Sequence, residues 1–273
     1  MKRFQELNLC DDFLFKEVMW DEKLVIGFLE MVLNLRGKIK GVKYIEEEKM
    51  LRHRYLDKSV RLDIYVLDTE ENVYNIEIQT SYFKNLPKRS RKYQSKLDSR
   101  ALKPGEDYDN LKKQYIIFVC TGDPFGEGLY KYTFSNRCHE LPSLELGDET
   151  TKIFLNTKGK KGEVSRELKA FLSFVEKSTV QNAEETKDLY VAQLSAKIED
   201  IKRDEELGGA FMTIEEKMEE LARRKMEEGL LEGKAEGMLE EKINIARAMK
   251  NEGFALEQIA KITKLTKEEI EKL

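Results

Sequence analysis

The chain has 273 residues, of which 37% are charged and 40% are hydrophobic, and its formal net charge is -4. This length suits one domain of ordinary size with a helical extension. No apolar run approaches the ~18 residues of a membrane span, and the first residues contain no apolar stretch of signal-peptide type. We therefore expect a cytoplasmic protein that has no membrane partner.

Cysteine and histidine usage argues against several kinds of site. The three cysteines are far apart and lack C-x-x-C spacing, which predicts reduced thiols rather than a disulfide framework. The histidines, His53 and His139, have no zinc-site spacing to a cysteine apart from the neighbours Cys138 and His139. A zinc site and a serine–histidine triad are therefore poorly supported.

The N-terminal part is expected to contain one helix followed by three strands. Residues 12–35 have helical periodicity, with Asp11 or Asp12 as the cap and Gly37 at the end. Residues 42–54 are typical of a strand. Segments 59–67 and 73–81 both alternate apolar and polar residues, and the short polar connection between them predicts an antiparallel hairpin.

The symmetric register of this hairpin sets two acidic side chains opposite each other. Its cross-strand pairs are Leu67 with Val73, Tyr65 with Asn75, Asp63 with Glu77, and Arg61 with Gln79. The face away from the acids is apolar and is expected to pack against a core; it carries Val60, Leu62, Ile64, Val66, Tyr74, Ile76 and Ile78. Directly opposed side chains lie roughly 5 Å apart at Cβ, and like charges there destabilise a sheet.

The repulsion between Asp63 and Glu77 must be offset by a shared proton, a cationic side chain or a divalent metal ion. Two alternatives stay open. Arg61 is two residues from Asp63 on the same face, so the acids could belong to a solvated ion-pair patch. A one-residue slip of the register would move every side chain to the other face.

A basic helix is predicted directly after the hairpin. Pro87 suits a first helical turn, and the helix continues over residues 88–102. Lys88, Lys92, Lys96 and Arg100 recur every four residues and form a stripe, which indicates a polyanionic partner such as DNA. The alternative is a solvated basic face. The candidate nucleic-acid contacts are Lys88, Arg89, Arg91, Lys92, Tyr93, Gln94 and Lys96.

The continuous apolar run 115–120 predicts a strand buried on both faces. Further short strands are expected at 129–134 and 152–155. Together these elements predict an α/β core that occupies residues 1–160.

Residues 161–242 are predicted to form a helical extension. Within it Gly229, Gly233 and Gly237 recur every fourth residue, and each costs a helix ~1 kcal/mol relative to alanine. Close approach between copies of the chain, giving a homo-oligomer, could offset this cost; a flexible, solvated helix is the alternative. Residues 243–273 are expected to form three short helices with helix-turn-helix spacing. The last begins with Lys267-Glu268-Glu269, which favours packing or partner contact over DNA reading.

These residues carry a family resemblance over most of the chain. Asp63 on its strand, Glu77-x-Gln79, KRSRKYQSKLDSRAL and YIIFVCTGDPFGEGLYKYTF resemble the PD-(D/E)XK nuclease superfamily. They are most similar to its recombination-promoting nucleases and putative transposases, as are the opening DDFLFKEVM and the glycine-spaced tail. The resemblance implies a restriction-endonuclease-like mixed sheet flanked by helices, with an all-α C-terminal extension.

The resemblance also implies site residues. Asp63 and Glu77 would ligate Mg²⁺, with Mn²⁺ as a substitute, and Gln79 would help to place the attacking water. Two positions depart from the pattern: Leu62 stands in place of proline, and Gln79 in place of lysine removes a positive charge. Further candidates are Asp12 or Glu46 to Glu48 as an extra acidic ligand, and Lys16 as a phosphate contact.

The leading interpretation is a Mg²⁺-dependent DNA endonuclease connected with recombination or mobile elements. The second is a catalytically weakened nuclease fold that acts as a DNA- or protein-binding module. A third is a scaffold assembled through the glycine-spaced helix. Strand transfer does not follow from these residues.

Overall fold

The computed structural model describes residues 3–273 except 48–49, 52–59, 62, 82 and 103–104. The chain divides into two compact units, Met1–Gly208 and Gly209–Leu273. The division at residues 160 and 242 expected from the sequence stays a prediction. Among the described residues, no helix combines the length and apolar character that crossing a membrane requires.

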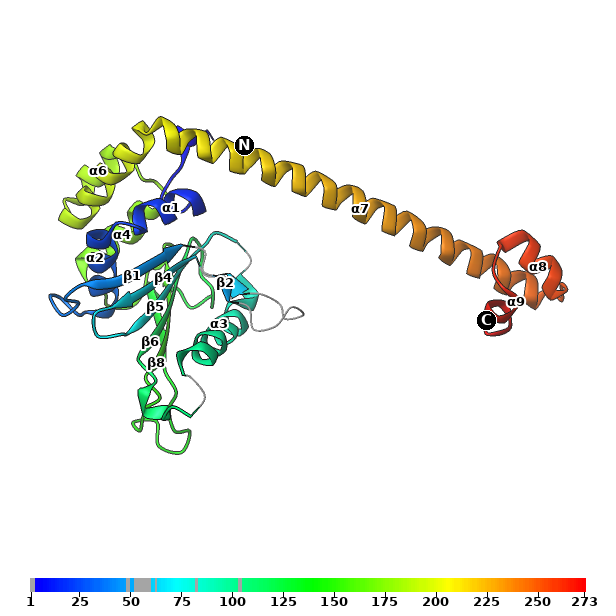
Figure 1. Ribbon diagram of the computed structural model, residues 1–273, viewed down its shortest axis with the longest axis horizontal. Helices are drawn as coiled ribbons and strands as arrows, with labels where there is room; N and C mark the ends of the chain where they lie inside the picture. Colours follow the sequence, from blue (N-terminus) through cyan, green and yellow to red (C-terminus); the bar gives the residue numbers. More distant parts are fainter. Residues whose placement is uncertain (1–2, 48–49, 52–59, 62, 82, 103–104) are drawn as a thin grey trace. The chain divides into compact units, whose positions relative to one another are not determined.

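The centre of the first unit is a mixed β-sheet (Figure 1). Among the described residues its strand order is β1-β4-β5-β6-β8-β7. The strands span Val42–Glu47 (β1), Ile64–Asp68 (β4), Val73–Gln79 (β5), Gln114–Cys120 (β6), Lys131–Phe134 (β7) and Thr150–Asn156 (β8). Pairing is parallel for β5-β6 and β6-β8 and antiparallel for β1-β4, β4-β5 and β7-β8. The expected mixed sheet with flanking helices is confirmed.

Strand β6 occupies an interior position because its sequence suits burial on both faces. Ile116 to Cys120 are all buried, as expected for the apolar run between two parallel neighbours. The strand expected at residues 42–54 is shorter in the structure. It ends at Glu47, and Met50–Leu51 (β2) pairs instead with Val60–Arg61 (β3) as a separate small sheet. Residues 52–54 lie outside the described part.

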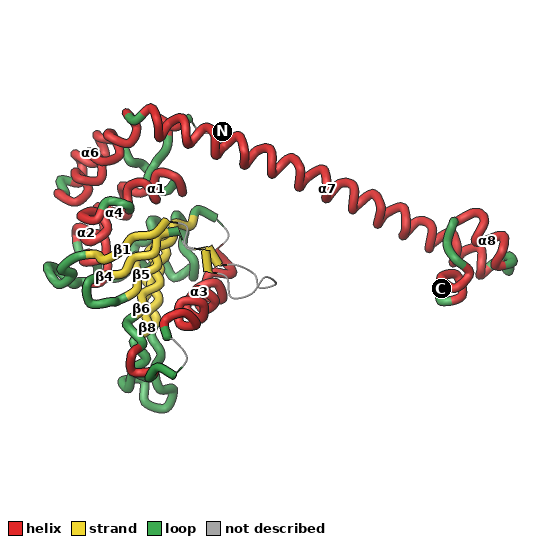
Figure 2. The backbone as a smooth tube through the Cα atoms, in the orientation of Figure 1, coloured by secondary structure: helices red, strands yellow, loops and turns green. Residues whose placement is uncertain are grey.

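Helices cover both faces of the sheet. Figure 2 shows α3 on the opposite side of the strands from α2 and α4. The helices of the first unit are α1 (Asp12–Met19), α2 (Glu22–Leu33), α3 (Leu86–Ala101), α4 (Arg166–Val175), α5 (Val180–Thr186) and α6 (Leu189–Arg203), with short 3-10 turns at Phe4–Glu6, Phe83–Asn85 and Tyr108–Asn110. Phe28 of α2 packs on Phe171 of α4 with ring centroids 5.3 Å apart.

The single helix expected at 12–35 is wrong, because the chain forms α1 and α2 there. The carboxylate of Asp21 accepts hydrogen bonds from the backbone N–H groups of Lys23 and Leu24, at 3.1 and 3.3 Å. This capping starts a new helix after Trp20. The helix then ends before Gly37, at Asn34, whose φ of 55° is left-handed.

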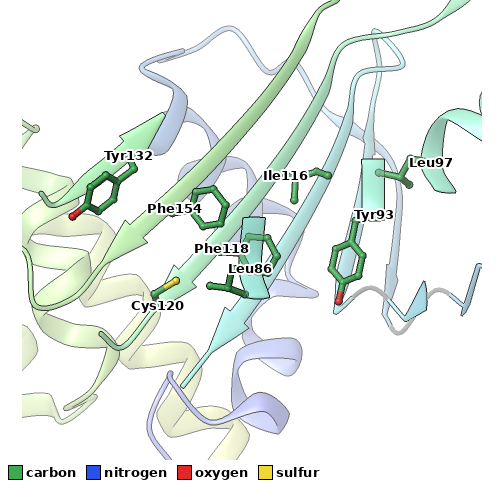
Figure 3. Close-up of a cluster of buried hydrophobic side chains, with 8 residues drawn as sticks. All are labelled: Leu86, Tyr93, Leu97, Ile116, Phe118, Cys120, Tyr132 and Phe154. Atoms are coloured by element: carbon green, nitrogen blue, oxygen red, sulfur yellow. The ribbon is translucent and has the colours of Figure 1, made fainter. Parts of the chain in front are cut away.

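Aromatic packing holds α3 against the sheet (Figure 3). The ring of Tyr93 stacks near Phe118 of β6 at 6.2 Å, and Phe118 stacks on Phe154 of β8 at 5.3 Å. The buried cluster comprises Leu86, Tyr93, Leu97, Ile116, Phe118, Cys120, Tyr132 and Phe154. This packing fixes which side of α3 faces β5 and β6.

The second unit has its own small core. Helix α7 (Glu205–Asn251) spans the boundary between the units, and α8 (Leu256–Thr263) and α9 (Lys267–Glu271) follow it. The buried residues are Ala246, Ile259, Leu265 and Ile270. Three short helices were expected at 243–273. The prediction of the first as a separate helix is wrong, because residues 243–251 continue α7.

Candidate active site

The hairpin of β4 and β5 has the predicted register along its described length. Tyr65 pairs with Asn75 and Leu67 with Val73, so a slipped register is excluded. The pairing predicted for Arg61 is wrong, because Arg61 lies in β3 and pairs with Met50. Strand β4 begins at Ile64, and Asp63 lies immediately before it.

Side chains take the place of the backbone ladder where β4 begins. The N–H of Asp63 donates to Oε1 of Glu77 at 3.2 Å, and the N–H of Ile78 donates to Oδ2 of Asp63 at 3.3 Å. Each carboxylate therefore accepts a hydrogen bond from the strand that carries the other. This reciprocal arrangement holds the two acids beside each other.

Glu77 is buried, and Asp63 is largely shielded from solvent. The side chain of Glu77 is 1% exposed and that of Asp63 is 19% exposed. The face that carries them also holds the fully buried Asn75. Arg89 of α3 forms an ion pair with Glu77. A solvated ion-pair patch does not fit this burial.

Burial and like charge raise the pKa of both carboxyl groups. For Asp63 the first cause is desolvation, and the charge of Asp12 adds to it. For Glu77 the pKa is raised by desolvation and then by the charge of Asp63. Protonation or a bound cation would each relieve this repulsion.

Two cationic side chains flank the acids. Nζ of Lys16, a residue of α1 that is only 3% exposed, lies 2.6 Å from Oδ2 of Asp12 and 4.0 Å from Oδ1 of Asp63. On α3, a terminal nitrogen of Arg89 lies 3.3 Å from Oε2 of Glu77. The structure therefore brings both secondary candidates, Asp12 and Lys16, to the acidic pair.

Gln79 lies at the end of β5 with both ends of its amide engaged. Its Oε1 accepts a hydrogen bond from Arg89 at 2.5 Å, and its Nε2 donates to the carbonyl oxygen of Ser81. The amide orientation is fixed, since a guanidinium can only donate.

The candidate DNA contacts on α3 divide by exposure. Lys88, Arg91 and Lys92 are exposed, and Arg89 is half-buried. Tyr93, Gln94 and Lys96 are buried, which interrupts the predicted stripe. Tyr93 and Gln94 are occupied by internal partners: the first packs on Phe118, and the second donates to Oε1 of Gln114 at 2.8 Å. Leu62 and Glu48 lie outside the described residues, as do the side chains of Glu46, Glu47, Arg61 and Arg100.

The donor set fits a hard divalent cation that keeps part of its water shell. Asp63 and Glu77 supply carboxylate oxygens, the ligands that Mg²⁺ prefers. In the described parts of the chain no cluster of three or more histidine, cysteine or acidic residues suits a metal ion. Sequence reasoning missed Asn75, whose Nδ2 donates to Glu77 at 3.0 Å and whose Oδ1 is buried without a partner in the described structure. Its place two residues from Glu77 on the same face was the available signal.

Comparison with protein families identifies the chain. A family model described as PD-(D/E)XK nuclease family transposase matches residues 9–229. The chain belongs to this nuclease family. A second model, the C-terminal HTH domain of the Rpn/YhgA-like nuclease family, matches residues 239–273, which confirms the helix-turn-helix character expected for the tail of this PD-(D/E)XK protein. No curated protein and no solved structure matched the chain.

Proposed function

We propose that this protein is a Mg²⁺-dependent endonuclease that hydrolyses phosphodiester bonds in DNA. The observation that carries the proposal is the buried pair Asp63 and Glu77, joined by reciprocal main-chain hydrogen bonds within a PD-(D/E)XK family fold. Burying two repelling carboxylates is unfavourable for folding alone. A cation-binding role explains why this chain has them.

The acids would hold the ion, which when bound neutralises phosphate charge and lowers the pKa of water. The water oxygen forms a bond to phosphorus while the bond from phosphorus to the leaving sugar oxygen breaks. The water releases one proton to solvent, and the leaving oxygen takes one up. Lys16, which contacts Asp12 and lies near Asp63, would attract a phosphate oxygen.

A plasmid-nicking assay tests the proposal directly. The wild type should convert supercoiled DNA in Mg²⁺ or Mn²⁺ and be inactive in EDTA, and Asp63→Ala and Glu77→Ala should each lower the rate at least ~10³-fold. Glu71→Ala is a matched control, because Glu71 is an exposed acid in the turn of the same hairpin. Equal cleavage by all four proteins would contradict the proposal.

Two surfaces, each within its own unit, would bind DNA: α3, and the tail, whose helix-turn-helix family match outweighs the acidic start of its last helix. The exposed cations Lys88, Arg91 and Lys92 and the helix-turn-helix family match support this part of the proposal. Lys88→Gln with Lys92→Gln should reduce the slope of log K against log salt by ~2, because each phosphate contact contributes ~0.9. The same change at Lys38 and Lys40, exposed on the loop before β1, should leave the slope unaltered.

A non-catalytic binding module is the second candidate. It is favoured by the engaged amide of Gln79 and by the cations that already neighbour each acid. It predicts salt-sensitive DNA retention in EDTA that survives Asp63→Ala, together with no nicking in any metal.

We also infer that the protein is a homo-oligomer through its C-terminal helices. The exposed apolar residues of α7, which include Leu221, Met226, Leu230, Met238 and Leu239, support this inference. Light scattering on the full chain and on a chain ending at residue 208 tests it, and equal subunit numbers in the two would contradict it.

A further inference from the structure

The guanidinium of Arg89 forms hydrogen bonds with several residues of the candidate site. Its Nη2 donates to Oε2 of Glu77 at 3.3 Å and to the hydroxyl of Tyr93 at 2.8 Å, and its Nη1 donates to Oε1 of Gln79 at 2.5 Å. The side chain of Arg89 therefore binds both Glu77 and Gln79, the two motif residues of β5.

Packing fixes the direction of this side chain. Tyr93 lies one turn along α3 from Arg89, and the guanidinium carbon lies 5.5 Å from the centre of its ring and 5.6 Å from that of Phe118. Arginine at these distances from two aromatic rings is held by cation–π attraction. The side chain is still 32% exposed, so it can be reached from solvent.

The contacts of Gln79 indicate a supporting role for that residue. The family pattern has a lysine at this position, and an amide there carries no charge. Its oxygen accepts from Arg89 and its nitrogen donates to the carbonyl of Ser81, so the amide braces the guanidinium.

We propose that Arg89 supplies the positive charge that the motif lacks at Gln79, by contacting the phosphate that is cleaved. Gln79 is then a positioning residue for Arg89. This inference rests on the proposed nuclease function. The guanidinium keeps its proton at every accessible pH, so Arg89 stabilises the charge that develops on phosphate oxygens during bond exchange and transfers no proton itself.

A purely structural role for Arg89 makes different predictions. If the guanidinium only neutralised Glu77, its loss would alter the melting temperature and metal affinity without a separate effect on turnover. If Arg89 only added to general phosphate attraction, its loss would resemble that of any exposed arginine on α3 and would disappear at low salt. Both alternatives are distinguishable from the proposal.

The experiment compares Arg89→Met with Arg91→Met, which removes a proposed DNA contact on the exposed side of the same helix, and with a control, Arg137→Met, at an exposed arginine in the loop after β7. For Arg89→Met we expect kcat to fall ~10²–10³-fold with KM within a few-fold, as when one donor to developing charge is removed. Mn²⁺ affinity by titration calorimetry should not weaken, because a cation beside Glu77 has been removed; a weaker affinity would assign the lost turnover to metal loss and overturn the role of Arg89. Arg91→Met should raise KM and retain kcat, and Arg137→Met should change neither.

Two further variants keep the test decisive if Arg89→Met does not fold. Arg89→Lys should retain part of the turnover, and the exchange variant Gln79→Lys with Arg89→Gln should recover more turnover than Arg89→Gln alone, since it returns the charge to β5. Methylguanidinium should restore cleavage to Arg89→Ala and have no effect on Asp63→Ala.

The outcomes separate this inference from the nuclease proposal. Wild-type kcat in Arg89→Met, or equal losses in Arg89→Met and Arg91→Met, would overturn the role of Arg89 while Asp63→Ala still showed that cleavage needs the acids. No cleavage by the wild type in any metal would instead overturn the nuclease function, and the role of Arg89 with it.

Discussion

At the residue scale, the acidic pair links folding to proton binding. Burial and mutual repulsion raise the pKa of Asp63 and Glu77 above their ordinary values. The folded protein therefore holds these protons more tightly than the unfolded chain does. Without metal, the stability that this pair contributes is fully present below the ordinary carboxyl pKa of ~4 and is lost as the pH rises through the raised pKa values.

Asp63→Asn should stabilise the metal-free protein at alkaline pH. The amide removes one of the two repelling charges and keeps an oxygen that can accept from the N–H of Ile78. In EDTA at pH 8.5 we expect the unfolding free energy to rise by ~1–2 kcal/mol, since one pKa unit corresponds to ~1.4 kcal/mol. Thermal melts between pH 4.5 and 8.5 measure the effect, which should vanish at the acidic end. A gain that is the same at every pH would contradict this explanation.

The sequence predicts the opposition of Asp63 and Glu77 because it depends only on strand alternation and a short connection. It does not predict the burial of Glu77, which requires α3 to cover that face of the sheet. Lys16 and Asp12 are one helical turn apart, so their contact is local. The approach of Lys16 to Asp63 depends instead on where α1 packs. Tertiary placement, rather than local pattern, decides the surroundings of the acids.

At the element scale, one cap decides whether the N-terminal segment is one helix or two. Apolar periodicity continues across residues 19–24, so the pattern alone favours a single helix. Asp21 offers its carboxylate to two backbone N–H groups, and such a cap is worth ~1 kcal/mol. An energy this small is not visible in hydrophobic periodicity.

Asp21→Ala should destabilise the first unit by ~1 kcal/mol through loss of this cap. Asp21 also lies 3.4 Å from Nζ of Lys197, so the ion pair needs its own control. Asp21→Asn removes the charge and keeps a capping oxygen, and it should lose only a few tenths of a kcal/mol. Urea unfolding measures both variants, and equal losses would assign the effect to the ion pair instead.

The glycines of α7 distinguish an assembling helix from a solvated one. A Cβ added at Gly229, Gly233 or Gly237 meets no described atom within 4 Å. Within one chain, Gly→Ala at all three should therefore raise helix content, by ~1 kcal/mol of helix stability each. If copies of the chain approach along this side, the same changes should lower the oligomer mass in light scattering, which is the result we expect. Gly209→Ala, also in α7 but far from the run of three glycines, is the control.

At the scale of the whole molecule, the sequence predicts which elements form the core better than it predicts which elements lie side by side. The hairpin, the basic helix and the buried strand β6 were predicted from local patterns and are present. The position of β8 between β6 and β7 was not predicted, because sheet order depends on contacts between distant segments. The tail was predicted as helical with helix-turn-helix spacing, and its family match confirms that character.

The separate cores of the two units predict separate responses to mutation. Ile259 is fully buried in the small core of the tail, and truncating such a residue costs ~2–5 kcal/mol. Ile259→Ala should therefore unfold the end of the second unit, seen as lost helical circular dichroism, while the melting transition of the first unit is unchanged. A lowered transition for the first unit would show that the units depend on each other.

The reciprocal hydrogen bonds of Asp63 and Ile78 give the site a built-in spectroscopic label. Both donors are main-chain amides, and their acceptors are the carboxylates proposed to hold the ion. Any cation that draws those oxygens toward itself must lengthen or bend these two bonds. The amide resonances and hydrogen-exchange rates of residues 63 and 78 should therefore report ion capture in solution, without DNA and without turnover.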